Sequence, residues 1–276
     1  MDDCSDAITS PLTSIAASYQ TVAPSPLEVG AIRLHPQPAS RPQPETRSAS
    51  CSNCYLQGVC LPSGLAADRV GELDDLTQVK RKVERGTALY RRGEVFDALY
   101  AIRSGSFKSV GVTPAQRQKV TGLHLPSELL GLDAISEGVH DYDAIALEDS
   151  DVCVVPYREL TTLTSTLPEL QTHLLQTLSG DITRDHGLVL RLGSMPAEQR
   201  VASFLWGLST RYQKLGFAGT RFDVRMVRRD IASYLGLTVE TVCRQLVRLQ
   251  REGVIEAEGR EVRLRDPRRL SELVGY

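Results

Sequence analysis

Short apolar runs separated by glycines occupy the chain from Val83 to about Pro156. The runs are residues 87–90, 99–102, 107–112, 121–125, 143–147 and 152–155. Short strands at such close spacing are typical of an antiparallel sandwich or barrel. Glycines that can supply the positive φ needed in tight turns lie beside these runs, at Gly86, Gly93 and Gly105.

After Pro168 the apolar period becomes helical and continues for about six turns. The stripe consists of Leu170, Leu174, Leu178, Ile182, Val189 and Leu192. So long a stripe is either core or a coiled-coil seam. The sequence contains no equally long partner helix, so we expect this helix to pair with the same helix of a second chain. A further helix is predicted over about residues 197–215.

Residues 228–246 have the anatomy of a helix-turn-helix. Ala232 is small where two helices must cross closely, and Gly236 can adopt the left-handed conformation at the turn. Thr238 stands at the N-cap of a second helix, which is predicted to end at Gly253. A small hairpin wing is predicted next, from residues 254–256 and 262–264.

The second helix of this motif carries the candidate DNA contacts near its N-terminal end, which is the end that enters the major groove. Arg244 can bond bidentately to guanine and Glu240 can accept from cytosine, each contact being worth roughly 1–3 kcal/mol of discrimination. The alternative is an i, i+4 surface pair worth about 0.3 kcal/mol. Inside this motif we favour base reading. Thr238, Arg228 and Arg229 are assigned to phosphate contacts.

Charge is divided unevenly along the chain. Residues 191–276 contain 16 Lys and Arg against 10 Asp and Glu, a net charge of +6, whereas residues 1–190 contain 16 against 24, a net charge of −8. The two parts sum to the overall charge of −2. A basic C-terminal third on an acidic body indicates a nucleic-acid-binding module attached to a second domain.

The first 50 residues differ in composition from the rest, because they contain seven of the 14 prolines and have little apolar periodicity. This predicts a disordered arm over residues 1–50. The acidic N-terminus does not look like a secretory signal, and no apolar stretch is long enough to span a membrane. We therefore expect a cytoplasmic protein without a membrane partner.

Four cysteines form a candidate metal site. Cys51, Cys54 and Cys60 follow the arm as C-x2-C-x5-C, and Cys153 comes 92 intervening residues later. Thiolates are ligands of iron-sulfur clusters and of structural zinc, and the spacing suits either. Three clustered ligands with one remote ligand favour a cluster modestly, and a thiol–disulfide switch is a further alternative. The remaining two cysteines, Cys4 and Cys243, stand apart from this set.

These features in this order resemble the FNR branch of the CRP/FNR transcription regulators, over about residues 51–275. The matching strings are residues 60–62, 99–105, 131–135 and 234–241. The resemblance implies a [4Fe-4S] cluster on the four cysteines, which supports a DNA-binding homodimer without oxygen and is degraded by oxygen. It also implies contact with RNA polymerase and a palindromic target like the FNR box.

Two departures from relatives concern ligand and DNA recognition. Where FNR proteins read DNA with Glu-x-x-Ser-Arg, this chain has Cys243 in place of the Ser, and a thiol is the weaker donor. Relatives that bind cyclic AMP hold its phosphate with an Arg after a Gly-Glu-Leu turn. Here the turn reads Ser127-Glu128-Leu129, and residues 129–157 contain seven acidic residues but no Lys or Arg. We expect no cyclic-nucleotide binding.

Asp185 interrupts the long apolar stripe between Ile182 and Val189. The predicted dimer seam therefore comprises Leu174, Leu178, Ile182, Asp185 and Val189. Two Asp185 carboxylates about 8 Å apart would repel by roughly 2 kcal/mol at an effective dielectric of about 20. The resemblance implies that such an Asp keeps the cluster-free form from dimerising. The alternative is that Asp185 points to solvent.

Together these observations predict an α+β protein. Its parts are a disordered arm (1–50), a cysteine loop with a cyclic-nucleotide-binding-like β-roll or jelly roll (51–165), a dimerisation helix (166–194) and a winged helix-turn-helix (195–276). The five histidines show no ligand spacing, and no catalytic triad, P-loop or dinucleotide motif is present. We therefore predict a regulator and not an enzyme; a cluster-bearing enzyme or electron carrier is the competing class.

Overall fold

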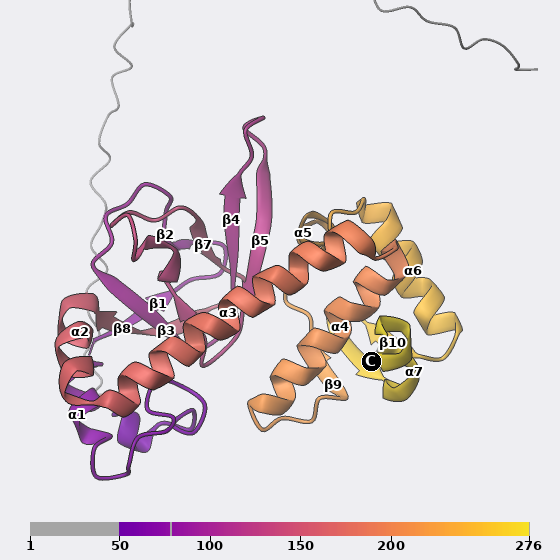
Figure 1. Ribbon diagram of the computed structural model, residues 1–276. Helices are drawn as coiled ribbons and strands as arrows, with labels where there is room; N and C mark the ends of the chain where they lie inside the picture. The colour runs from indigo at the N-terminus through magenta and orange to yellow at the C-terminus, as the bar shows by residue number, and fades with distance from the viewer. Residues whose placement is uncertain (1–49, 78, 276) are drawn as a thin grey trace, which may run out of the picture. The chain divides into compact units, whose positions relative to one another are not determined.

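The computed structural model describes residues 50–77 and 79–275. The predicted arm, apart from Ser50, and Cys4 lie outside these ranges. Two four-stranded antiparallel sheets form the N-terminal domain, in the orders β1-β8-β3-β6 and β2-β7-β4-β5 (Figure 1). The strands are β1 (Lys80–Val83), β2 (Ala88–Tyr90), β3 (Ala98–Ser104), β4 (Phe107–Val112), β5 (Gln118–His124), β6 (Leu129–Leu130), β7 (Asp143–Ala146) and β8 (Ser150–Pro156).

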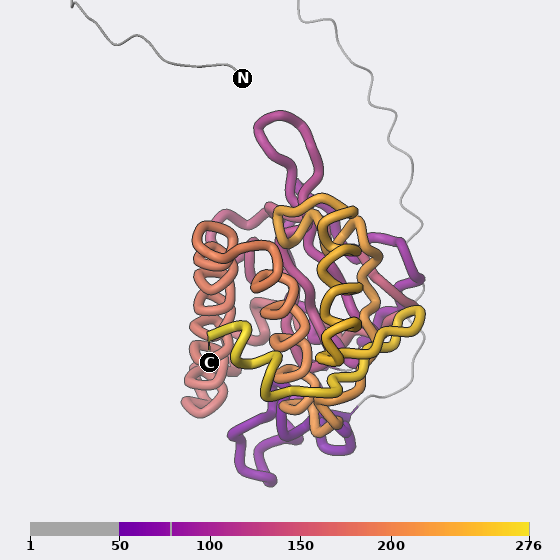
Figure 2. The backbone as a smooth tube through the Cα atoms, turned by 90° about the vertical axis from the view of Figure 1, so that its right-hand side faces the viewer, coloured from indigo at the N-terminus to yellow at the C-terminus, as the bar shows by residue number. Residues whose placement is uncertain are grey.

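The predicted roll is confirmed, and each of the six apolar runs contributes to a strand. Inward-facing side chains such as Phe107 and Ile102, both 0% exposed, fill the core of the roll. Gly86, Gly93 and Gly105 all have φ between 82° and 84°, as the turns required. At Gly105 a Cβ would lie 2.1 Å from the Ser150 hydroxyl, so this glycine is also needed for close packing. The hairpin of β4 and β5 extends beyond the other strands (Figure 2).

Short helices precede and follow the roll. The cysteine loop contains the 3-10 turn η1 (Cys51–Asn53) and leads to α1 (Gly71–Leu76), and a second 3-10 turn, η2 (Leu132–Ala134), follows β6. Helix α2 (Tyr157–Thr166) was not anticipated from the apolar pattern. It buries only Leu160, so its stripe is too short to stand out in the sequence.

The long helix α3 (Pro168–Ser194) begins at the predicted proline, which occupies the first turn where its missing N–H costs nothing. Only Leu170 is fully buried. Leu174 packs with the core between the cysteine loop and the roll. In contrast, Leu175, Ile182 and Val189 are 60%, 56% and 67% exposed and follow one another at intervals of seven residues. The outward apolar face of α3 thus includes Leu175, which the predicted seam lacked.

The C-terminal domain consists of α4 (Ala197–Lys214), β9 (Arg221–Asp223), α5 (Arg228–Leu235), α6 (Val239–Arg251), β10 (Ile255–Glu258), β11 (Glu261–Leu264) and α7 (Pro267–Val274). The wing is a three-stranded sheet in the order β10-β11-β9, one strand more than the predicted hairpin. Its core also contains Val120 and Leu123 of the roll, so the two domains share apolar packing. Within the described ranges, no helix combines the length and apolar character needed to cross a membrane.

Candidate functional sites

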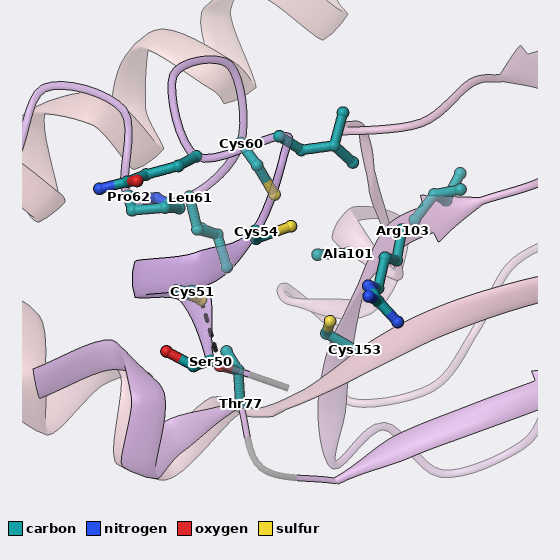
Figure 3. A pocket seen from close by; sticks show the side chains of 13 residues that line it. Ser50, Cys51, Cys54, Cys60, Leu61, Pro62, Thr77, Ala101, Arg103 and Cys153 are labelled. Carbon is teal, nitrogen blue, oxygen red and sulfur yellow. Dashed lines mark hydrogen bonds between the residues drawn. The ribbon is translucent and has the colours of Figure 1, made fainter. Parts of the chain in front are cut away.

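All four predicted cysteine ligands line one pocket (Figure 3). Cys51, Cys54 and Cys60 come from the loop before α1, and Cys153 comes from β8 on the opposite wall. Figure 3 shows the sulfurs of Cys54, Cys60 and Cys153 pointing into the same space. The fold thus brings together Cys60 and Cys153, which have 92 residues between them, and all four thiols are free and only partly exposed.

Hydrogen bonds to α1 and the roll hold the cysteine loop in place. Asp74 of α1 accepts from the hydroxyls of Ser50 and Ser52 at 2.8 and 2.7 Å. The Tyr55 hydroxyl donates to the carbonyl of Arg103 on β3 at 2.5 Å. Leu56 and Leu61, each 2% exposed, anchor the loop in the core. The loop is therefore a built wall of the pocket.

Thr77 supports the first cysteine. Its hydroxyl lies 3.2 Å from the Cys51 sulfur and also donates to the Leu73 carbonyl at 2.8 Å. Either atom can be the donor in the contact between Cys51 and Thr77, and this contact lowers the pKa of the Cys51 thiol against the larger rise caused by burial.

Burial makes the thiols of Cys51, Cys60 and Cys153 poor acids on their own. Desolvation raises the pKa of Cys60 to about 12, and it raises the pKa of Cys51 in the same direction. The pKa of Cys153 is raised to about 11, by burial first and then by Cys51 and Cys54, with Lys80 and Arg103 opposing the rise. A metal ligand must be a thiolate, so this pocket favours thiolates only when a positive group such as iron or zinc enters it.

No histidine of the described residues lines the cysteine pocket. His124 is buried against Ser109, its Nε2 lying 2.6 Å from that hydroxyl, and desolvation lowers the pKa of His124 to about 4. His140 stacks on Tyr90 with ring centroids 3.7 Å apart. Within residues 50–77 and 79–275, no three His, Cys, Asp or Glu side chains have the arrangement that would hold a single metal ion.

The helix-turn-helix has the predicted turn and cap. Gly236 follows α5 with φ 62° and ψ 39°, in the left-handed region. The Thr238 hydroxyl caps α6 by accepting from the Thr241 amide at 3.1 Å. Ala232 and Val242 are both buried in the core between α5 and α6. These contacts fix the angle at which α6 leaves the domain.

The three predicted base-reading side chains lie exposed near the start of α6. The side chains of Glu240 and Arg244 are 86% and 64% exposed, and Cys243 is exposed beside them. Arg244 and Glu240 form the anticipated i, i+4 pair, with Nη1 3.7 Å from Oε1. So long and exposed a pair is worth little, about 0.3–0.5 kcal/mol, and leaves both groups available to a ligand.

Glu240, Cys243 and Arg244 form the base-reading strip of α6. The residues predicted to contact phosphate border this strip. Thr238 and Arg229 are exposed, and Arg228 is half-buried at the start of α5. Arg248, farther along α6, is bonded to Glu198 at 2.9 Å and to Glu252 at 2.7 Å. Among the cations of α6, Arg248 is therefore already paired within the chain, and Arg244 is the better placed to meet DNA.

Some residues around the sites were missed from the sequence. Thr77 and Arg103 reach the cysteine pocket only through the fold, and no local pattern marks them. Leu175 could have been found, because it lies seven residues before Ile182. Asp185 is exposed on the same helix, as both the repulsion hypothesis and its solvent alternative require.

Comparison with known proteins places both domains. A model of the Crp-like helix-turn-helix domain matches residues 199–273, and a model of the cyclic nucleotide-binding domain matches residues 80–166. Among solved structures, FixK2 from Bradyrhizobium japonicum is similar with a TM-score of 0.65 and 28% identity, over 71% of this chain and 97% of that chain.

Whole-chain relatives are transcriptional regulators. The transcriptional regulatory protein btr of Bordetella pertussis is 44% identical over 228 residues, which cover 83% of this chain and 94% of that protein. The transcriptional activator protein FnrA of Stutzerimonas stutzeri is 39% identical, with coverage of 83% and 94%. The fumarate and nitrate reduction regulatory protein of Escherichia coli K12 is 36% identical, with coverage of 82% and 90%.

Proposed function

The chain belongs to the CRP/FNR family of transcriptional regulators, and from this premise we propose that it senses oxygen through a [4Fe-4S] cluster on Cys51, Cys54, Cys60 and Cys153. It is a DNA-binding regulator and not an enzyme. The observation that carries the proposal is the convergence of these four thiols, three from one loop and one from a distant strand, on a single pocket.

The chemistry of the donors supports a cluster. Buried thiols with a raised pKa need a positively charged partner to become thiolates. Structural zinc is held by the same kind of thiolate ligand, so a colourless zinc protein is the outcome that the test below must distinguish. A [4Fe-4S] cluster is held by four Cys thiolates, as many as line this pocket, and when bound it would supply iron that oxygen can oxidise.

The cysteine loop packs directly against the start of α3. Cys51, Cys60 and Cys153 belong to the same apolar core as Leu170 and Leu174 of that helix. Fixing the loop through its sulfurs would therefore steady α3 and its outward face. We propose that this face pairs with a second copy and that ligation shifts a weak dimer equilibrium by about 1–3 kcal/mol, a size typical of allosteric coupling.

Two copies of α6 would then read a palindrome resembling the FNR box, with half-sites about one helical turn apart. Glu240, Cys243 and Arg244 would contact bases, and Thr238, Arg228 and Arg229 would contact phosphates. Contact with RNA polymerase and a cytoplasmic location complete this proposal.

We propose that the roll does not take a cyclic nucleotide, although its fold matches that domain type. Residues 129–157 contain no Lys or Arg that could pair with a phosphate. The Glu128 carboxylate of the adjoining turn is already bound by Arg211 of the same chain.

The test is purification of the full chain without oxygen, followed by iron and sulfide analysis, a visible spectrum and binding to an FNR-type palindrome before and after admitting air. We expect about four irons per chain, and a spectrum that bleaches as dimer and DNA binding are lost. A colourless zinc protein, or one that binds DNA equally in air, would refute the oxygen-sensing proposal.

A further inference from the structure

Glu128 joins three parts of the molecule. It lies in the turn between β5 and β6, and its carboxylate accepts from Arg211 of α4 through both oxygens, at 2.9 and 2.6 Å. Arg184 of α3 lies 3.6 Å from Oε1. The carboxylate also accepts from the amide of Leu125 at 3.0 Å, which fixes the turn itself.

This junction is mostly shielded from water, since the side chains of Glu128 and Arg211 are 16% and 19% exposed. Burial by itself would raise the pKa of Glu128, but Arg211 and Arg184 outweigh it and hold this pKa below its ordinary value. The carboxylate is therefore charged at neutral pH, and the two-oxygen geometry gives the contact a defined direction.

The backbone of the same turn is bonded to the wall of the cysteine pocket. The Ile102 amide donates to the Glu128 carbonyl at 3.0 Å, and the Ser127 amide donates to the Ile102 carbonyl at 2.8 Å. Ile102 lines the pocket, and its neighbour Ala101 is the register partner of Cys153. Cys153 is thus paired with the residue just before Ile102, and the backbone of Ile102 holds the turn that contains Glu128.

The turn is also strained. Ser127 has φ 73°, in the left-handed region that side chains other than glycine adopt at a cost. Such a conformation persists because neighbouring bonds hold it, here the two bonds to Ile102. A change in the position of β3 would therefore release or reinforce the turn.

A cavity of about 630 Å³ gives this junction room to rearrange. Its lining includes Glu128, Arg184 and Arg211 together with Cys60 and Leu61 of the cysteine loop. Cys60 and Leu61 also line the cysteine pocket. The Glu128 carboxylate and the cysteine loop therefore line the same cavity, in addition to being linked through the backbone hydrogen bonds of Ile102.

We infer that Glu128 is a positioning residue that couples the state of the cysteine pocket to the DNA-binding domain through its grip on Arg211. This rests on the proposed function. Arg211 belongs to α4, which packs against α6, so the position of the Arg211 helix sets the position of the base-reading helix. In this arrangement Glu128 transmits the occupancy of the pocket and takes no part in binding metal or DNA.

The experiment compares the full wild-type chain with Glu128→Gln, which keeps the size of the side chain and removes its charge. Each protein is prepared without oxygen, and its affinity for a labelled FNR-type palindrome is measured with the cluster present and after its removal. The ratio of the two affinities is the coupling. We expect Glu128→Gln to reduce this ratio by about tenfold, within the range typical of allosteric coupling, while iron content and visible spectrum stay as in the wild type. The melting temperature should fall, because Arg211 and Arg184 lose their counter-charge.

Two variants sharpen the result. Arg211→Lys keeps the positive charge but loses the two-oxygen geometry, and it should lower the coupling ratio in part. Glu137→Gln, at an exposed position of the same acidic region, should leave the ratio unchanged. If Glu128→Gln retains the wild-type ratio, or if it loses its iron, the inference is wrong. A wild-type ratio of one would instead show that the proposed function itself has failed.

Discussion

The cysteine pocket and the base-reading strip of α6 are opposite kinds of site. The pocket is concave and apolar, and its four sulfurs come from segments that only the folded roll brings together. The strip is exposed and charged, and its residues lie within one helical turn of each other. A change in the pocket should therefore act on the whole molecule, whereas a change on the strip should act on DNA affinity alone.

The largest effect is expected from Cys153→Ser. Loss of the thiolate from β8 removes the only ligand on that wall of the pocket, so we expect loss of iron and visible absorbance and a fall of DNA affinity to that of the cluster-free protein. Iron analysis and operator titration without oxygen measure both. Cys243→Ser is the matched control, since this exposed thiol lies outside the pocket. Cys243→Ser should keep its iron. An equal loss of iron in this control would show that the iron does not depend specifically on the cysteines of the pocket.

Arg244→Ala should have the next largest effect. Removing a bidentate base contact costs about 1–3 kcal/mol, so operator affinity should fall by about 5- to 150-fold and discrimination at one base pair should relax. Competition titrations with singly substituted operators measure this. Arg251→Ala, at the other end of α6, should change affinity far less. A uniform loss against all operators, or a loss of iron, would contradict a base-reading role confined to the strip.

Asp185→Ala tests whether α3 connects the two sites through dimerisation. If paired Asp185 carboxylates repel by about 2 kcal/mol, their removal should strengthen the cluster-free dimer by about 30-fold, as measured by analytical ultracentrifugation in air. Asp185 lies exposed on the helix that carries Leu175, Ile182 and Val189. A variant that stays monomeric in air at the same concentrations as the wild type would favour the solvent alternative.

The same contrast explains how much the sequence could predict. The helix-turn-helix is local, so Gly236 and Thr238 by themselves predicted the turn and the cap that the structure has. The roll followed from its apolar runs, but α2 and β6 did not, because neither has enough buried positions to form a pattern. Thr77, Arg103 and the Glu128 junction lie beyond sequence reasoning, since they depend on contacts between residues 26 to 83 positions apart.

The smallest effect is expected where the roll meets the helix-turn-helix directly. Lys108 of β4 donates to both oxygens of Asp230 on α5 at 2.8 Å, and the two side chains are 19% and 13% exposed. A partly buried pair of this geometry should show a coupling energy of about 1 kcal/mol in a double-mutant cycle of Lys108→Met and Asp230→Asn, measured by urea unfolding. The exposed ion pair of Glu240 and Arg244 is the internal comparison. A double-mutant cycle of Glu240→Gln and Arg244→Met should give a coupling energy of about 0.3 kcal/mol. Equal coupling energies in the two cycles would mean that burial does not strengthen the Lys108–Asp230 pair. The contact between the roll and α5 would then hold α5 and α6 in place no better than an exposed ion pair does.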